Sequence, residues 1–369
     1  MKIFIAGFAN SGKTTIFNAL TGLNLDTTIY PTPLTKETTP HHGVVNVPDE
    51  RLERLSSVFK PKKTTPATLQ FIDYIGIIPN DPERNRMVYD LIKDSEAIVH
   101  VVRAFEDESV MHPSGSVDAL RDVRNFETEL IIGDMEFVEK RLERIEEQAK
   151  KGKRPDEADR THLLKCREAL EGEVSLRDVQ FTDAERRLML PYQFLTTMPE
   201  IIVLNIGEDQ IGSDVIQRLQ DDVINYFKGK GNGIIPPVIP VCGKMEMEIA
   251  QLPEDERRGF LEEMGIGEPA MERLCKITYE TLGLISFLTV GKDEVRAWTI
   301  KGGTNAQSAA GRIHSDMERG FIKAEVVSYD DFISSGKDMH RVKERGLLRL
   351  EGKDYIVKDG DIITFKFNV

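Results

Sequence analysis

The chain has 369 residues, of which 40% are apolar and 30% charged, and its formal net charge is -13. This composition is typical of globular proteins and excludes a collagen-like or largely disordered chain, and no apolar run approaches the roughly 20 residues of a membrane helix. At roughly 150 residues per domain, the length predicts two or three domains. The acidic charge argues against DNA or RNA binding over the whole surface but leaves room for a local basic patch.

The cysteine content indicates a reducing compartment. Cys166, Cys242 and Cys275 lie far apart in the sequence. Three scattered cysteines fit neither a disulfide framework nor a zinc cluster. Polar residues from Asn10 onward interrupt the apolar start of the chain, which therefore does not have the form of a signal peptide. We expect a cytoplasmic protein with reduced thiols and with neither a membrane nor DNA as its partner.

The first part of the chain alternates strand-like and helical patterns. Short β-branched runs at residues 2–6, 69–72 and 98–102 are separated by stretches of helical periodicity. This alternation is typical of βαβ units and of a mainly parallel sheet. We predict that residues 1–127 form the first part of an α/β domain.

A phosphate-binding motif follows the first of these strands. Residues 7–15 read GFANSGKTT and satisfy the pattern G-x-x-x-x-G-K-[ST] directly before a helical stretch. The pattern predicts that backbone N–H groups surround the phosphates of a nucleotide, that Lys13 reaches the β and γ oxygens, and that Thr14 binds Mg²⁺. Lys13 would also stabilise the transition state electrostatically. The expected phosphate-binding residues are Asn10, Ser11, Gly12, Lys13, Thr14 and Thr15.

A D-x-x-G element follows the strand at residues 69–72. In GTPase-type folds the aspartate of this element lies beside Mg²⁺ and the glycine N–H contacts the γ-phosphate, so we expect these roles for Asp73 and Gly76. Many GTPases continue with a glutamine that orients the attacking water. Ile77 stands here instead and cannot hold water. We therefore expect slow intrinsic hydrolysis, or a different group that holds the water.

Residues 205–208 read N-I-G-E, where a GTPase has N-K-x-D. The aspartate of that motif accepts hydrogen bonds from guanine, and the lysine stem packs on the base. Glu208 is one methylene longer and Ile206 replaces the lysine, so the guanine contacts are lost, whereas the edge of adenine loses nothing. We predict a preference for ATP over GTP, with adenine beside Asn205, Ile206 and Glu208.

Beyond residue 128 the pattern becomes that of a helical hairpin. Apolar residues recur at alternating spacings of four and three, and Gly152 and Pro155 interrupt a basic stretch before a second helix. We predict a coiled-coil arm over residues 128–195, in which Thr182 and Glu185 form a capping box for a further helix. The basic tip could be a solvated cluster or could contact rRNA phosphates.

After the arm, the α/β pattern resumes. Strand-like runs at residues 201–205 and 236–241 predict that residues 196–282 form the second part of the α/β domain. Short strands separated by Gly and Asp turns then predict a separate β-rich domain over residues 283–369. Trp298, the only tryptophan, is expected to anchor its core rather than to stack on a nucleic-acid base.

These features resemble the YchF family of Obg-related P-loop ATPases over essentially the whole chain. The resemblance lies in the phosphate loop with Asn10, in N-x-x-E, and in the segments HVVRAFED at 100–107, VRAWTIKGGT at 295–304, AAGRIHSDMERGFIKAEV at 309–326 and GKDYIVKDGDI at 352–362. It implies a P-loop NTPase domain of the TRAFAC class, an inserted helical coiled-coil arm and a C-terminal ubiquitin-like β-grasp (TGS) domain. It also implies hydrolysis of ATP in preference to GTP, and association with ribosomes.

Two segments depart from the family pattern. After Asp73 the chain reads DYIGIIPNDPERNRMVYD, which is shorter and lacks the usual glycine-rich run, so the switch that reports the nucleotide state could be altered. The segment YPTPLTKETTPHHGVV at residues 30–45 is longer than usual. Thr35, Thr38 or Thr39 could supply the second Mg²⁺-facing hydroxyl, and we favour Thr35.

Two residues have two interpretations each. By resemblance to potassium-activated relatives, Asn10 could help to hold a K⁺ beside the phosphates, or it could only satisfy backbone groups of its loop. His112 matches a family histidine and could position the water that Ile77 cannot hold, or it could be a solvated loop histidine.

The sequence thus predicts a slow ATPase that requires Mg²⁺ and associates with the large ribosomal subunit or the whole ribosome, as a regulator of translation or of a stress response. One alternative is a nucleotide-gated ribosome- or RNA-binding module with negligible hydrolysis. Another is a small-molecule P-loop kinase, which would need an arginine-rich lid where this chain has an arm.

Overall fold

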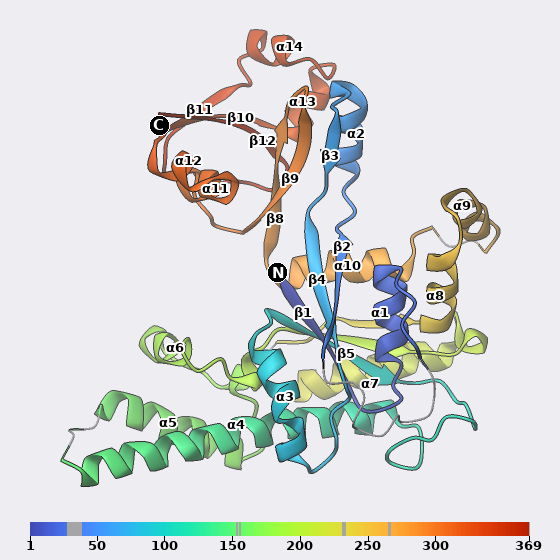
Figure 1. The fold of residues 1–369 in the computed structure, drawn as a ribbon, viewed down its shortest axis with the longest axis vertical. Coiled ribbons are helices and arrows are strands. Elements are labelled where there is room, and N and C mark those ends of the chain that lie inside the picture. Colours follow the sequence, from blue (N-terminus) through green and yellow to red (C-terminus); the bar gives the residue numbers. More distant parts are fainter. Residues whose placement is uncertain (28–38, 153, 155, 231–233, 265–266, 369) are drawn as a thin grey trace. The chain divides into compact units, whose positions relative to one another are not determined.

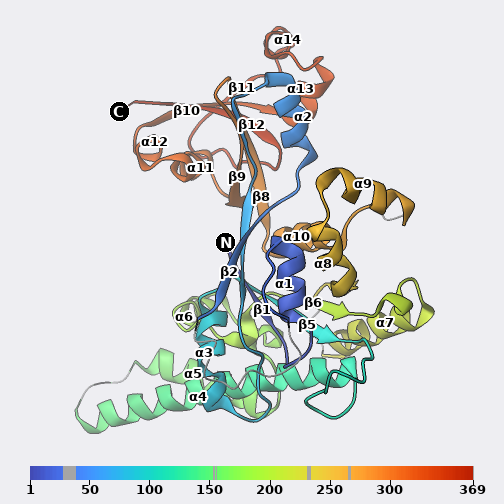
Figure 2. The same cartoon turned by 45° about the vertical axis from the view of Figure 1, so that its right-hand side comes forward.

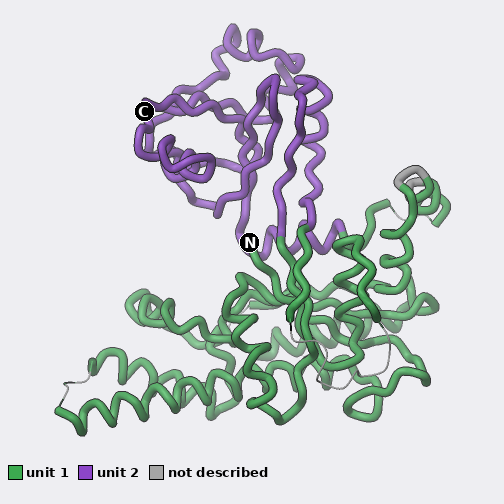
Figure 3. Tube along the Cα trace, viewed as in Figure 1, with its two compact units in different colours: residues 1–44, 70–271 green, residues 45–69, 272–369 purple. Residues whose placement is uncertain are grey.

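The computed structural model describes residues 1–27, 39–152, 154, 156–230, 234–264 and 267–368. The chain forms two compact units, each made of two separate stretches (Figure 3). Unit 1 comprises Met1–Val44 and Gln70–Met271, and unit 2 comprises Val45–Leu69 and Glu272–Val369. The ranges expected from the sequence divide the chain differently, because none of them groups residues 45–69 with the C-terminal part.

The sheet of unit 1 confirms the predicted α/β class. Its strand order is β2-β4-β1-β5-β6-β7, and β1 pairs in parallel with both β4 and β5. Phe4, at the centre of β1, is fully buried, as expected for a sheet covered on both faces. The strands are β1 (Lys2–Ala6), β2 (His41–Asn46), β4 (Thr68–Asp73), β5 (Ala97–Arg103), β6 (Glu200–Asn205) and β7 (Val238–Val241).

The predicted strands lie where the sequence placed them, with one shift. The last was expected from residue 236, but β7 begins at Val238, since Pro236 and Pro237 have no N–H to donate to a neighbouring strand. The order of the strands reverses at β1: β2 and β4 lie on one side of it, and β5, β6 and β7 lie on the other. Ligands of such sheets bind at this switch point, beyond the carboxyl ends of the strands.

Helices cover the sheet of unit 1 (Figure 1). Of the helices that the structure describes, none combines the length and apolar character needed to cross a bilayer. The α-helices are α1 (Lys13–Thr21), α3 (Pro82–Lys93), α4 (Ala119–Lys150), α5 (Glu157–Glu171), α6 (Asp183–Met189), α7 (Asp214–Gly229), α8 (Gly243–Gln251), α9 (Glu254–Glu263) and the start of α10 (Ala270–Thr281). Short 3-10 helices are η1 (Leu176–Asp178), η2 (Leu195–Thr197) and η3 (Glu208–Gln210).

The arm is built on one long helix. Helix α4 runs for 32 residues and lies alongside α5 in both views (Figures 1 and 2). It begins earlier than the hairpin expected from residue 128, because the side chain of Asp118 accepts the Arg121 N–H and caps it. The seam between α4 and α5 buries Val138, Leu142, Leu163, Cys166 and Leu170. The predicted capping box of Thr182 and Glu185 is confirmed at α6.

Unit 2 has its own mixed sheet, in the order β11-β10-β12-β8-β9-β3. Strand β3 comes from residues 45–69 and pairs in parallel with β9. Trp298 packs against the core of this unit and donates a hydrogen bond to Thr289 Oγ1 at 3.0 Å. The strands are β3 (Lys63–Thr65), β8 (Leu284–Val290), β9 (Glu294–Lys301), β10 (Phe321–Ser328), β11 (Arg349–Glu351) and β12 (Asp361–Phe367), and the helices are α2 (Glu50–Phe59), α11 (Ala306–Ile313), α12 (Ser315–Arg319), α13 (Tyr329–Ser334) and α14 (Met339–Glu344).

Candidate nucleotide-binding site

The phosphate-binding motif forms the turn between β1 and α1. Gly12 caps α1 with a φ of 92°, and a Cβ atom there would lie 2.1 Å from Asn205 Nδ2, so only glycine fits. Lys13, Thr14 and Thr15 form the first turn of α1, where unpaired N–H groups and the helix dipole favour an anion. The Ser11 side chain is buried, and its hydroxyl has no hydrogen-bond partner within the described part of the chain.

Lys13 is the buried cation of the loop. The residue is 7% exposed, and Nζ donates to the backbone oxygen of Phe8 at 2.8 Å. Burial lowers the pKa of Lys13 to about 8, against the opposing effect of the nearby Asp73 carboxylate. A triphosphate would replace the single carbonyl contact with charge-assisted ones.

A hydroxyl and a carboxylate lie together at the mouth of the loop. Asp73 ends β4, and its Oδ2 accepts a hydrogen bond from Thr14 Oγ1 at 2.8 Å. Both are hard oxygen ligands, and Mg²⁺ is usually held by one or two such groups together with phosphate oxygens and water. The residue pair therefore fits Mg²⁺. Thr35 and Thr38 lie outside the described residues.

Gly76 brings the segment after Asp73 against the phosphate loop. A Cβ atom on Gly76 would lie 2.7 Å from the Ala9 nitrogen and 2.8 Å from Lys13 Nζ. The next residue, Ile77, is 1% exposed, and its N–H donates to the Gly7 oxygen at 3.0 Å. The aliphatic side chain therefore points into the core and holds no water.

Asn205, at the end of β6, connects its own loop to the phosphate loop and to the loop after β7. Its Nδ2 donates to the Ser11 oxygen at 2.9 Å, and its Oδ1 accepts the Gly243 N–H at 3.1 Å. Ile206 is 7% exposed, where the GTPase motif has a lysine. Glu208 pairs with Lys244, with 3.1 Å between Oε1 and Nζ. This hydrogen bond raises the pKa of Lys244.

Gly243 and Lys244 contact the expected site residues Asn205 and Glu208, and the sequence interpretation missed them. They follow β7 at the start of α8, in the stretch CGK that matches none of the motifs considered. The available signal was positional: in a parallel sheet the loop after each strand lies at the same edge, so the loop after β7 had to approach the loop after β6.

His112 is held away from solvent by two partners. The ring is buried, Nε2 lies 2.8 Å from Asp122 Oδ2, and Nδ1 accepts the Ser114 N–H at 3.1 Å. It is therefore not the solvated loop histidine of the second interpretation. Positioning water would require the ring to leave Asp122, so the catalytic role stays a prediction.

Asn10 joins the phosphate loop to the His112 loop. It adopts a φ of 61°, and its Nδ2 donates to the backbone oxygen of Met111 at 2.9 Å. The side chain thus satisfies a backbone group, but one that belongs to the His112 loop and not to its own loop. It also holds Met111, the neighbour of His112 in the sequence, beside the expected phosphate site.

The fold and the site define a class of protein. A parallel sheet whose first strand leads through a G-x-x-x-x-G-K-T loop into a helix, with a hydroxyl and a carboxylate at its mouth, is the nucleotide-binding domain of P-loop nucleoside triphosphatases. Family models agree. The model described as a 50S ribosome-binding GTPase matches residues 2–135, and YchF-GTPase_C, described as a protein of unknown function, matches residues 284–368.

The chain belongs to the YchF family, as the resemblance implied. The protein named ribosome-binding ATPase YchF from Bacillus subtilis (strain 168) is 41% identical over 99% of this chain and 98% of its own. The protein of the same name from Escherichia coli O157:H7 is 37% identical over 100% and 99%. The solved structure of the Schizosaccharomyces pombe YchF GTPase matches with a TM-score of 0.82 at 29% identity, covering 99% of this chain and 97% of that one.

Proposed function

We propose that this protein binds and slowly hydrolyses ATP with Mg²⁺, and prefers ATP to GTP. The observation that carries the proposal is the loop after β6. Asn205 is fixed by Ser11 and Gly243. Ile206 is buried where guanine would need a lysine stem, and the Glu208 carboxylate is paired with Lys244 instead of being free to accept from guanine. Adenine requires none of these missing contacts.

The residues of the loop would share the work of phosphate transfer. Thr14 and Asp73 would hold Mg²⁺, which when bound supplies Lewis-acid neutralisation of the phosphate oxygens. Lys13 and the N–H groups from Asn10 to Thr15 would bind the phosphates and stabilise charge as water attacks in line. Thr35 would add a second hydroxyl, and Gly76 would contact the γ-phosphate through its N–H.

Slow turnover follows from the buried Ile77 and from the engaged ring of His112. The same two observations favour the alternative, a nucleotide-gated binding module with negligible hydrolysis. Adding ribosomes to a turnover assay separates the two, since a pure binding module would show no acceleration. Comparing the rates in potassium and sodium salts tests whether Asn10 helps to hold a K⁺.

Ribosome association is supported by the names of the relatives, both called ribosome-binding ATPases. The arm offers Lys150, Lys151 and Arg154 near its turn, a charge cluster suited to rRNA phosphates. We place the protein in the cytoplasm, without membrane or DNA partners, as a regulator of translation or of a stress response. Cosedimentation with ribosomes, with and without ATP, tests this assignment.

The affinities for ATP and GTP provide the primary test. Tighter ATP binding supports the proposal, and equal or tighter GTP binding contradicts it. Lys13→Ala should abolish binding of both nucleotides while the circular dichroism spectrum stays that of the wild type. Undiminished binding by this variant would remove the phosphate loop from its assigned role.

A further inference from the structure

The segment after Asp73 is fixed to the phosphate loop on one side. Phe8 and Ile77 form a parallel bridge, and the Ile77 N–H donates to the Gly7 oxygen at 3.0 Å. Gly76 approaches Lys13 so closely that a Cβ atom would lie 2.8 Å from Nζ. A phosphate that draws in the Gly76 N–H would therefore also move Ile77 and the residues that follow it.

On its other side, the same segment is fixed to helix α4 by Glu129. The N–H of Asn80, which has a φ of 58°, donates to Glu129 Oε1 at 2.7 Å. Asn85 is 1% exposed and donates to Glu129 Oε2 at 3.4 Å. The Asn85 side chain also binds both backbone groups of Ile78, accepting from its N–H at 2.9 Å and donating to its oxygen at 2.8 Å. A fixed turn thus stands where the family has a glycine-rich run.

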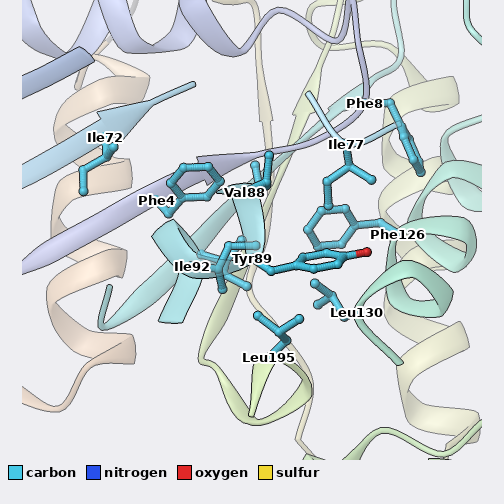
Figure 4. Close-up of a cluster of buried hydrophobic side chains, with 12 residues drawn as sticks. Phe4, Phe8, Ile72, Ile77, Val88, Tyr89, Ile92, Phe126, Leu130 and Leu195 are labelled. Atoms are coloured by element: carbon cyan, nitrogen blue, oxygen red, sulfur yellow. The ribbon is translucent and has the colours of Figure 1, made fainter. Parts of the chain in front are cut away.

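Helix α4 extends from this contact into the arm. Around Glu129, Phe126 and Leu130 pack in the cluster that contains Ile77 (Figure 4). About two and a half to three and a half turns further along, Val138 and Leu142 pack in the cluster of α5. The helix is continuous between the two clusters, so a shift or rotation at its Glu129 end is carried to the arm.

We propose that Glu129 is a positioning residue that couples the γ-phosphate-sensing segment, residues 73–80, to the arm. With ATP bound, Glu129 holds Asn80 and Asn85 so that the Gly76 N–H stays against the phosphate, and the strain of that contact passes into α4. With ADP bound, the segment has no γ-phosphate to contact, so nothing is transmitted from Gly76 to α4. This inference rests on the proposed function and adds the route by which the nucleotide state reaches the arm.

The test compares Glu129→Ala with the wild type, using Mg²⁺ with ADP and with a non-hydrolysable ATP analogue. The variant loses the acceptor for Asn80 and Asn85, so the affinity for the analogue should fall about five- to tenfold, whereas that for ADP should change less than about twofold. In the wild type, hydrogen exchange of residues 138–150 should differ between the two nucleotides. In the variant this difference should disappear. Glu139→Ala, an exposed change on the same helix, should behave as the wild type.

If Glu129 has only a structural role, Glu129→Ala should lower the affinities for ADP and for the analogue equally and should leave the exchange difference in place. Either result overturns the proposal. An absence of any exchange difference in the wild-type arm does the same. If Glu129→Ala does not fold, Glu129→Gln keeps the size and the acceptor for Asn80 but places an NH₂ group against Asn85 Nδ2. It should then show a smaller effect in the same direction. Failure of the wild type to bind either nucleotide contradicts the proposed function itself.

Discussion

Lys244 pairs with Glu208, the carboxylate that we expect beside the base. The ion pair is exposed, so Lys244→Ala should alter stability little. It should free the Glu208 carboxylate to accept from the N1–H and N2–H₂ groups of guanine. We expect the ratio of GTP to ATP affinity to rise about two- to fivefold, measured by competition against a fluorescent nucleotide.

The matched comparison is Asn205→Ala, which changes the same loop after β6 but leaves the pair of Glu208 and Lys244 in place. Asn205 is 4% exposed, and its loss removes the hydrogen bonds to the Ser11 oxygen and from the Gly243 N–H. The affinity for both nucleotides should fall about tenfold, with their ratio unchanged. If Lys244→Ala also leaves the ratio unchanged, the ion pair has no part in base selection.

At the residue scale, what the sequence could predict depended on local spacing. Lys13, Thr14 and Asp73 belong to short motifs whose spacing is set by the backbone turn they build, and Thr14 and Asp73 do lie in contact. Glu129 and Lys244 belong to no such motif. Their partners come from other loops. Glu129 binds Asn80, 49 residues away in the sequence, and Lys244 binds Glu208 in the loop after β6. Only the folded sheet and helices bring these pairs together.

Among the elements, α4 and the 3-10 helix η2 are joined by a buried carboxylate. Asp134 of α4 accepts the N–H groups of Leu195 and Thr196 at 2.8 Å each, and the Thr196 hydroxyl at 2.7 Å. Burial raises the pKa of Asp134 from 3.8 to about 6, although these hydrogen bonds act in the opposite direction. From roughly pH 4 to 6 the native protein therefore binds more protons at this site than the unfolded chain, and stability is lost as the pH rises.

Asp134→Asn removes this titration. As the pH rises from 4 to 6, the wild type should lose up to about 3 kcal/mol in its free energy of unfolding relative to the variant. Urea denaturation at pH 4, 5, 6 and 7 measures the difference. Glu139→Gln, on the exposed face of α4, is the matched control variant. A constant difference for Asp134→Asn would show that Asp134 titrates as an ordinary aspartate.

Element boundaries were less predictable than element types. The heptad seam correctly indicated a helix paired with a second one, but the first turns of α4 carry the core residues Val123 and Phe126 and lie before the seam. These apolar residues pack against the sheet and not against α5, so a search for a single apolar stripe places the start of α4 too late. The cap at Asp118 was the local signal for the true start.

At the scale of the whole molecule, unit 2 contains a helix from the first fifth of the chain. Helix α2 packs against β8 and β9, and the ring of Phe59 stacks on that of Phe332 with 5.5 Å between the centroids. The amphipathic pattern of α2 is typical of a helix with one buried face, but no pattern in a single sequence says which sheet it covers. The pairing of β3 with β9, Thr64 opposite Val295, is equally invisible to local periodicity.

Leu55→Ala tests whether unit 2 depends on α2, through a probe at the far end of the chain. Leu55 is fully buried on α2, so the change should cost unit 2 about 3 kcal/mol. Trp298, the only tryptophan of the chain, lies in unit 2, and its fluorescence therefore reports the unfolding of that unit. The variant should lower the denaturant midpoint of the fluorescence transition. Leu130→Ala, the same change at a fully buried site of unit 1, should leave that midpoint in place. A midpoint unaffected by Leu55→Ala would mean that unit 2 folds without α2.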